Sequence, residues 1–447
     1  MLGALEFFLL NITVITASVL TGLYSIHVKS WIQLFIVFIC SFLIILRIYG
    51  LIHDQVLMRY IPEITYRPFA RKFDRDVFNK NNPHIAVTEE DLKQPFVQQM
   101  MRSACPIIRT SPSNTKALII LHGFGANSEC FDNFGDMKKI LGVESIAFDI
   151  YVVPTPFHFN SLDNDNLNCE ILTEFIERYI NKTLDESTHD EIKNYPKSWR
   201  LKKDYAKENV TVLGHSMGGL CLCALLANEK QIKAQNIVLY TPALVLKESI
   251  TSLYWFIRFF TLFFKKLRIT SQISDTESNS ISKEQFATTY AQSNMDKIAE
   301  YEANHRINSL LGHKQIMNLK AVIELLDFSK ETQKNMKSLQ TKPDYSVFVL
   351  AVKENYSCDV DKSFELLKKY FHVTDANIKV FNIGAHATLH FCPFSETCFE
   401  DGDNTLPNEK AFAMCLKNII QKGTLTIPKS SQTQKPSTSS QTPKPSA

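Results

Sequence analysis

Ser216, in the stretch VTVLGHSMGGL from Val210 to Leu220, is the residue best placed for covalent chemistry in this sequence. It fits the pattern G-x-S-x-G, in which the serine occupies a sharp strand-to-helix turn and small neighbours let the backbones approach closely. An apolar β-branched run precedes it and a helix-forming run, LCLCALLANEK, follows it. This context predicts that Ser216 is a nucleophile. The simpler interpretation is a structural serine in a glycine-rich turn.

A second stretch, LIILHGFGAN from Leu118 to Asn127, predicts where the charge formed by such an attack is stabilised. A tetrahedral oxyanion in acyl transfer needs two preorganised N–H donors. We expect the backbone N–H of Met217, directly after the serine, and that of Phe124, directly after His122-Gly123, to form this oxyanion hole. His122 itself is expected to be structural rather than catalytic.

Short apolar runs rich in β-branched residues predict the strands that position these motifs. They lie at 117–121, 145–153, 210–213, 236–240, 346–352 and 378–383. Their nearly continuous apolar character is typical of a parallel sheet covered on both faces. Because helix-like runs separate them, the sequence predicts a doubly wound α/β sheet.

The motifs LHGFGANS, LGHSMGGL and IGAHATLH occur in this order and resemble those of α/β-hydrolases of the monoacylglycerol lipase, lysophospholipase and serine aminopeptidase group. The resemblance covers roughly Cys105 to Lys422. It implies an α/β-hydrolase fold in which nucleophile, acid and histidine follow one another along the chain. It also implies that His386, after Gly384-Ala385, is the general base, with His390 as the alternative.

The acid of the catalytic triad departs from the pattern of this group. Related chains commonly carry G-x-x-D-x-x-V-D after the penultimate strand, whereas this chain reads VKENYSCD and places Asn355 at the usual acid position. An asparagine orients an imidazole but does not neutralise the imidazolium. Glu354 is therefore our first expectation for the acid, with Asp359 as the alternative and Asn355 as the third. Asp359 also precedes a helical pattern, where it would serve as an N-cap.

An insertion at 246–341 separates the two parts of the predicted hydrolase core, 105–245 and 342–422, and is expected to be a helical cap over the serine. Within it, Ser252–Ile269 reads as one helix with a basic polar face opposite an aromatic face. This composition is typical of an interfacial amphipathic helix, and the alternative is a helix that packs its aromatic face on the core. Either way, an apolar cap predicts a substrate with an acyl chain.

The N-terminal region, 1–53, contains two uncharged runs, Phe7–His27 and Ser30–Leu46, with Lys29 between them. Each is close to the length that crosses a bilayer, so we predict two transmembrane helices and a membrane bilayer as partner. Basic residues are concentrated after the second run, and the positive-inside rule then places the catalytic domain on the cytoplasmic side. The alternatives are two buried core helices, or an N-terminal signal with an exported domain.

The remaining segments and the composition limit the other classes of function. Residues 54–104 read as a juxtamembrane connector, and 423–447, rich in Ser, Thr, Pro and Lys, as a disordered tail. A net charge of +3 is too small to indicate a nucleic-acid partner. The sequence has no nucleotide-binding or metal-binding motif, so no cofactor is expected, and the oligomeric state is left open. Its ten scattered cysteines suit free thiols in a reducing compartment.

These observations predict a membrane-anchored serine hydrolase that cleaves carboxylic esters of lipids, with monoacylglycerol or lysophospholipid as the substrate class. A thioesterase or a serine peptidase on the same scaffold is one alternative, because a fold does not determine the substrate. A catalytically weak membrane scaffold is the other, and the irregular acid loop is the feature in its favour.

Overall fold

The computed structural model describes most of the predicted hydrolase core and parts of the segments around it. The described residues are 31–61, 75–94, 97, 106–124, 141, 143, 145–155, 167–263, 266–269, 315–339, 344–352, 358–381, 398–401 and 404–425.

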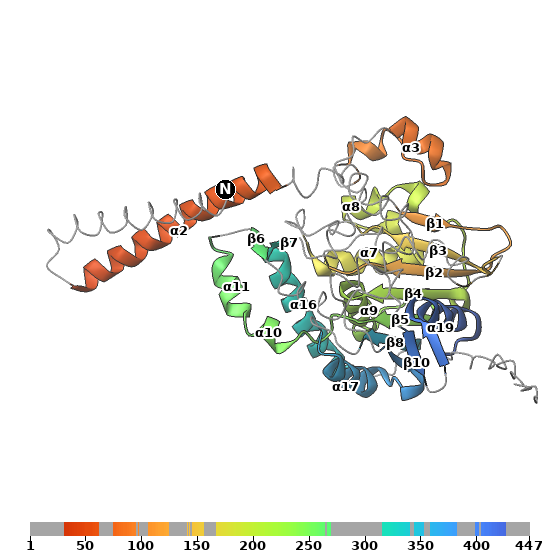
Figure 1. The fold of residues 1–447 in the computed structure, drawn as a ribbon. Helices are drawn as coiled ribbons and strands as arrows, with labels where there is room; N and C mark the ends of the chain where they lie inside the picture. Colours follow the sequence, from red (N-terminus) through yellow and green to blue (C-terminus); the bar gives the residue numbers. More distant parts are fainter. Residues whose placement is uncertain are drawn as a thin grey trace, which may run out of the picture.

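A seven-stranded sheet forms the centre of the described chain (Figure 1). Its strands, in chain order, are β1 (Ile107–Arg109), β2 (Lys116–Leu121), β3 (Phe148–Val153), β4 (Val210–His215), β5 (Asn236–Tyr240), β8 (Ser346–Val352) and β9 (Ile378–Phe381). They lie side by side in the order β1-β3-β2-β4-β5-β8-β9. All neighbouring pairs are parallel except β1 with β3. The predicted, mainly parallel α/β sheet is therefore confirmed.

The register of the parallel strands brings several loops to one edge of the sheet. His215 at the end of β4 pairs with Tyr240 at the end of β5, and Tyr240 pairs in turn with Leu350 on β8. Val352 at the end of β8 pairs with Phe381 at the end of β9. The chain segments that follow these strands therefore all leave the sheet at the same carboxyl edge.

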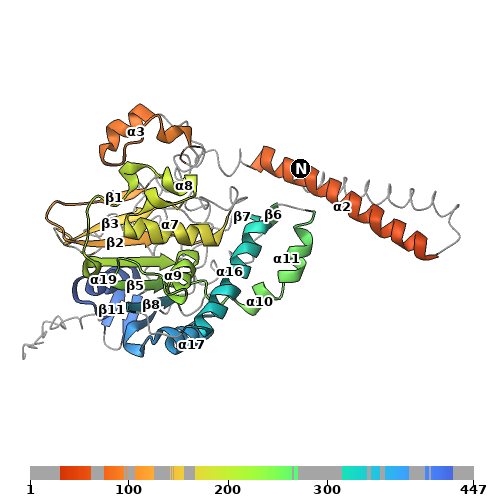
Figure 2. The ribbon, with the colours of Figure 1, turned by 180° about the vertical axis from the view of Figure 1, so that it is seen from behind.

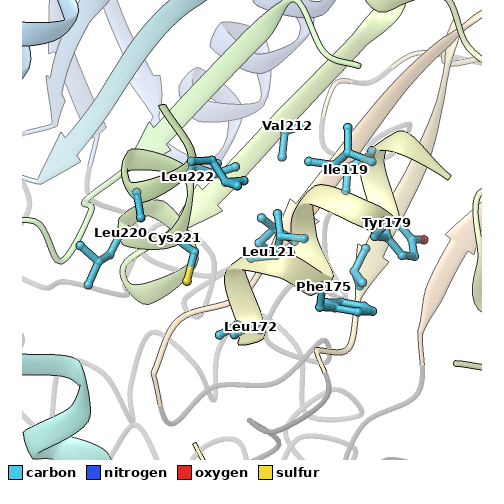
Figure 3. Packing of buried hydrophobic residues seen from close by; sticks show 14 of the residues in the cluster. Ile119, Leu121, Leu172, Phe175, Tyr179, Val212, Leu220, Cys221 and Leu222 are labelled. Atoms are coloured by element: carbon cyan, nitrogen blue, oxygen red, sulfur yellow. The ribbon is translucent and has the colours of Figure 1, made fainter. Parts of the chain in front are cut away.

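Alternate residues of the strands enter two separate hydrophobic cores, because successive side chains point to opposite faces of a sheet. On β2, Ile119 and Leu121 belong to the core on one face, and Leu118 and Ile120 to the core on the other. Figure 3 shows Ile119, Leu121 and neighbouring strand residues packed against side chains of the helices on the first face. Both faces of the central strands are thus buried, which explains their continuous apolar sequences.

Helices cover both faces of the sheet. On the first face lie α7 (Cys169–Asn181), α9 (Met217–Ala227), α16 (Leu319–Lys337) and α17 (Val360–Phe371), and α19 (Asn408–Lys422) packs on the second. α9 is buried along its whole length, since it lies between the sheet and the helices α7 and α16. α7 begins where the Asn168 side chain accepts a hydrogen bond from the Ile171 N–H, and it ends at Lys182, which has a left-handed backbone conformation.

Shorter elements complete the described part of the chain. They are α3 (Arg75–Asn81), η2 (Pro83–Ile85), η3 (Asp91–Lys93), η6 (Leu184–Glu186), α8 (Asp190–Lys193), η7 (Lys197–Trp199), η8 (Lys207–Asn209), η9 (Asp375–Asn377), β10 (Cys398–Asp401) and β11 (Asn404–Pro407). The region predicted to be a connector contributes to the core here. Ile85 and Val87 are buried, and the Trp199 indole N–H donates to the Ile85 carbonyl at 3.0 Å.

The insertion after β5 differs from the single amphipathic helix predicted for Ser252–Ile269. It forms α10 (Glu248–Thr251), α11 (Tyr254–Phe260) and β6 (Lys266–Ile269), and β6 pairs antiparallel with β7 (Gln315–Asn318) directly before α16. The predicted helix therefore stops early, because its last residues pair with a distant strand. The aromatic side chains of α11 also do not pack on the core as a group: Trp255 is 74% and Phe256 58% exposed.

The predicted two-span anchor is wrong. Its first span, Phe7–His27, lies outside the described residues, and its second forms part of α2 (Trp31–Ile61). Within the residues that the structure describes, no helix has both the length and the apolar character needed to cross a bilayer. This finding overturns the membrane localisation that was inferred from the anchor.

The contacts of α2 give a physical reason for this correction. α2 runs beside the insertion (Figures 1 and 2), and its residues Leu43, Leu46 and Tyr49 pack against a small cluster around Phe263 and Leu319. The guanidinium of Arg47, in the middle of the helix, donates to the carbonyls of Leu262 and Phe263. Part of the apolar surface of α2 is thus used in contacts with protein. The helix also continues eight residues beyond the predicted boundary at 53, to Ile61.

Candidate active site

Ser216 lies between the end of β4 and the start of α9, as its sequence context predicted. Its backbone angles, φ 50° and ψ −108°, fall in a region that residues with side chains rarely adopt. The positions around Ser216 must be glycines because there is no room for a β-carbon. A β-carbon at Gly214 would come within 2.6 Å of the Gly218 carbonyl group, and one at Gly218 within 2.8 Å of the Leu121 oxygen. The G-x-S-x-G sequence therefore forms a strained strand-to-helix turn at Ser216, as the pattern predicted.

The loop after β2 lies against this turn. A β-carbon added at Gly123 would come within 3.0 Å of the Ser216 Cβ and 2.8 Å of the His215 Nδ1. Phe124, next in the chain, is partly buried against the core. Met217 is the first residue of α9, where a helix leaves its backbone N–H groups without partners inside the helix. The structure thus places Gly123, directly before the predicted donor Phe124, against Ser216, and Met217, the other predicted donor, at the start of α9.

His122 connects this loop to the segment after β3 through its two ring nitrogens. It is buried, and its Nε2 lies 3.0 Å from the Thr155 hydroxyl and accepts from the Thr155 N–H. Since Nε2 is an acceptor, Nδ1 carries the proton and donates to the Gly123 carbonyl at 3.1 Å. Burial lowers the pKa of His122 to about 4, although the hydrogen bond to Gly123 opposes this shift. His122 is therefore a neutral residue that holds the loop after β2 to the segment after β3.

The turn after β5 forms two backbone hydrogen bonds with Ser216. The Ser216 N–H donates to the Tyr240 carbonyl at 3.0 Å, and the Ser216 carbonyl accepts from the Ala243 N–H at 2.9 Å. Between these two residues, Thr241 has a φ of 40°. A β-branched residue in this conformation is strained by roughly 1–3 kcal/mol. Two strained residues, Ser216 and Thr241, thus follow directly after the neighbouring strands β4 and β5 at the carboxyl edge of the sheet.

Two side chains of α16 form hydrogen bonds with the chain directly after this turn. The Leu244 carbonyl accepts from the Ser329 hydroxyl at 2.8 Å and from the Gln333 side-chain amide at 2.7 Å. Near the start of the helix, the Glu324 carboxylate accepts from the Cys169 N–H at the start of α7. The insertion is therefore attached firmly to the core close to Ser216, and Ser216 itself is only 7% exposed.

The other predicted catalytic residues are placed as follows. His386, His390, Glu354 and Asn355 lie outside the described residues. Asp359 is described, and its carboxylate caps α17 by accepting from the Lys362 N–H at 3.1 Å. Burial opposes ionisation, but the hydrogen bonds from Lys362 hold the pKa of Asp359 below its usual value. This is the N-cap role that the helical pattern after Asp359 indicated.

The comparison with protein families supports the class of protein that the fold and the serine turn define. The serine aminopeptidase family matches residues 189–390, a little less than half of the chain. The chain thus resembles the α/β-hydrolases in sequence, as the motifs predicted, and the match supports a hydrolase. None of the curated proteins compared with the chain matches it.

Solved structures with a similar arrangement include two monoacylglycerol lipases. That of Paleococcus ferrophilus is 15% identical, with a TM-score of 0.43 over 71% of this chain and 97% of its own. A soluble variant of the monoglyceride lipase from Saccharomyces cerevisiae, in complex with a substrate analogue, is 11% identical, with a TM-score of 0.42 over 72% and 92%. Likenesses this weak carry no inference about the substrate of this chain.

Two features of the site were not found from the sequence. The strain at Thr241 has no local signal, because the dipeptide Thr-Pro after a strand does not indicate a positive φ. The pairing of His122 with Thr155 joins residues 33 positions apart on separate loops. A short strand followed directly by His-Gly could have indicated that His122 has a partner on a neighbouring strand end.

Proposed function

We propose that this protein is a serine hydrolase that cleaves carboxylic esters of lipids, with monoacylglycerols or lysophospholipids as the substrate class. The observation that carries the proposal is the strained Ser216 turn, with the Gly123 loop packed against its β-carbon. Such a turn presents its hydroxyl for attack on a carbonyl, and the N–H groups beside it receive the oxyanion.

The proposed reaction proceeds through an acyl-enzyme. His386 removes the proton from the Ser216 hydroxyl, which attacks the ester carbonyl, while the N–H groups of Phe124 and Met217 hold the oxyanion. Collapse of the tetrahedral intermediate releases the alcohol, which takes the proton from His386. Water, deprotonated by His386, then attacks the acyl-enzyme; the fatty acid is released, and His386 returns the proton to the leaving Ser216 oxygen.

The strand register supports this choice of base and acid. Residues 353–357, which include Glu354, follow β8, and the segment with His386 follows β9. Because β8 and β9 pair up to their last residues, Val352 and Phe381, both segments start from the edge of the sheet that carries Ser216. Glu354 is the proposed acid, with Asp359 and Asn355 as alternatives.

The insertion supports a substrate with an acyl chain. α10 and α11 follow the turn that holds Ser216, and α11 exposes Trp255, Phe256 and Phe259. Aromatic side chains left unburied on the insertion suit apolar chains better than sugars or charged peptides.

A fluorophosphonate probe, which reacts with activated serines, tests the nucleophile. We expect labelling of the wild-type protein and its loss in Ser216→Ala, while Ser198→Ala, at a buried serine hydroxyl elsewhere in the fold, keeps it. Equal labelling of wild type and Ser216→Ala would contradict the mechanism. Hydrolysis of monoacylglycerol, lysophospholipid, acyl-CoA and aminoacyl arylamide by the same preparation then separates lipase, thioesterase and peptidase activity.

A further inference from the structure

The ring of His215 lies directly against the loop after β2. His215 is the last residue of β4, it precedes Ser216 in the chain, and it is only 3% exposed. A β-carbon added at Gly123 would come within 2.8 Å of the His215 Nδ1 and 3.1 Å of its Cε1. The ring edge that carries these two atoms therefore occupies the space in which a side chain of Gly123 would lie.

A row of packed aromatic rings holds the His215 ring in place. His215 pairs with Tyr240 on β5, and their ring centroids are 4.9 Å apart with an angle of 33° between the ring planes. The Tyr240 ring packs in turn on Phe412 of α19 at 4.9 Å, and both of these residues are fully buried. Because rings in a close-packed core have little freedom to move, the His215 ring presents a fixed edge to Gly123.

The contact at Gly123 matters because of the peptide group that follows this residue. The Gly123 carbonyl and the N–H of Phe124, the proposed oxyanion donor, belong to the same planar peptide unit and move together. The carbonyl accepts from the His122 Nδ1 at 3.1 Å, and the α-carbon of Gly123 lies beside the His215 ring. Two histidine rings thus contact the residue that sets the direction of the Phe124 N–H.

We propose that His215 is a positioning residue of the hydrolytic site, whose ring holds Gly123 so that the N–H of Phe124 is directed at the oxyanion. The inference rests on the proposed function, because it needs an oxyanion to form at Ser216. Donors to an oxyanion act through preorganisation, and a misplacement of about 1 Å can lower the rate by roughly 10²-fold. Since the oxyanion forms only during the reaction, the loss of this positioning affects kcat more than substrate binding.

The test uses three substitutions at His215 and one elsewhere in the core. His215→Leu removes the ring at similar volume, His215→Phe keeps a ring that can stack on Tyr240, and His215→Ala makes room beside Gly123. The matched control is Phe175→Leu in α7, since the Phe175 ring is fully buried and lies 5.0 Å from that of Tyr195. Thermal unfolding shows which of the variants are folded.

We expect His215→Leu and His215→Ala to lower kcat for ester hydrolysis by roughly tenfold or more, with KM nearly unchanged. His215→Phe should keep more of kcat than His215→Leu. Phe175→Leu should keep the kcat of the wild type even where its melting temperature falls.

A double variant distinguishes positioning from a general structural role. His215→Ala should lower kcat in the wild type but not in Gly123→Ala, because in that variant the added methyl group has already moved the loop and meets the His215 ring. The double variant should therefore be no slower than Gly123→Ala alone.

A wild-type kcat in the folded His215→Leu or His215→Ala variant would overturn the inference. So would a His215→Phe variant as slow as His215→Leu, or effects of His215→Ala and Gly123→Ala that simply multiply. Ser216→Ala, assayed in parallel, separates these results from a failure of the proposed function. If Ser216→Ala keeps full turnover, the proposed mechanism is wrong. If it is inactive while the folded His215 variants are not impaired, only the role of His215 is wrong.

Discussion

Gly123 and Ser216 are packed so closely that a β-carbon on Gly123 would lie 3.0 Å from the β-carbon of Ser216. Contacts this short between such atoms are tighter than ordinary packing allows, and the ring of His215 closes the same space from a second direction. The loop after β2 and the turn at Ser216 therefore meet at Gly123, with no room for a side chain between them.

Gly123→Ala should abolish most of the activity. The methyl group would push the loop and its N–H groups away from the serine, and the loss of one oxyanion donor alone costs roughly 10²–10³-fold in kcat. Ester hydrolysis and circular dichroism of the variant measure the effect and show that the protein is folded.

Gly423→Ala is the control for this substitution. Gly423 has a positive φ of 64° and no atom within 4 Å of an added β-carbon. It should lose about 1 kcal/mol of stability from backbone strain but keep its activity. A Gly123→Ala variant with unchanged kcat would show that the loop does not form the oxyanion hole.

Stability should depend on pH through His122. The unfolded chain protonates this histidine below the ordinary histidine pKa of 6.5, whereas the folded protein protonates it only near its pKa of about 4. Between these values the unfolded state binds more protons, so the free energy of unfolding decreases as the pH falls. From pH 7 to pH 4 the loss from this group is roughly 3 kcal/mol.

His122→Gln removes this titration and should flatten the pH dependence, as measured by urea unfolding at both pH values. The partly exposed His189 provides the control His189→Gln. If the wild type and His122→Gln show the same slope between pH 7 and pH 4, His122 does not have the lowered pKa that its burial indicates.

Separate substitutions at Glu354 and Asp359 test which of the two residues is the acid of the triad. Glu354→Gln should lower kcat by roughly 10³-fold or more, because the imidazolium loses its charged partner. Asp359→Asn should keep both turnover and the α17 cap, and Asp359→Ala should cost about 1 kcal/mol of stability with turnover kept. Kinetics and thermal unfolding of the three variants measure these effects.

The opposite pattern, with Asp359→Asn inactive and Glu354→Gln active, would assign the acid to Asp359. If neither substitution lowers kcat and Asn355→Ala does, the triad contains an asparagine. If none of the three changes turnover, the proposed triad is wrong.

The exposed aromatic residues of α11 should contribute to the hydrolysis of esters with long acyl chains but not to that of short esters. Trp255→Ser and Phe256→Ser are expected to lower kcat/KM for a long-chain monoacylglycerol by several-fold to roughly tenfold each, because apolar contact area with the chain is lost. Hydrolysis of an acetate ester, which has no long chain, should stay nearly unchanged.

Ile44→Ser serves as the control for α11. Ile44 is 60% exposed on α2, and its substitution should alter neither substrate. Equal losses for the long-chain and the acetate ester in the α11 variants would contradict a role of α11 in chain binding.

The amino-acid sequence by itself determined the central strands and the serine turn. These rest on local rules: a strand buried on both faces needs a continuous apolar run, and a tight strand-to-helix turn needs glycines at fixed positions around Ser216. The same rules brought the loop after β2 to Ser216, since β2 and β4 are parallel neighbours and the carboxyl ends of parallel strands meet at one edge.

Only the tertiary structure decided the features that depend on distant partners. Ser252–Ile269 has a helical pattern, but its end pairs with Gln315–Asn318, and pairing between segments so far apart leaves no periodic signal. α2 contains most of the uncharged run Ser30–Leu46 that predicted a membrane span, but it packs against the insertion through Leu43, Leu46 and the hydrogen bonds of Arg47. The positive φ of Thr241 likewise accompanies contacts with two distant segments, since its own N–H donates to Leu350 on β8 while Tyr240 and Ala243 bind Ser216. Such features are set by which surfaces meet in the folded chain, and composition alone does not encode that choice.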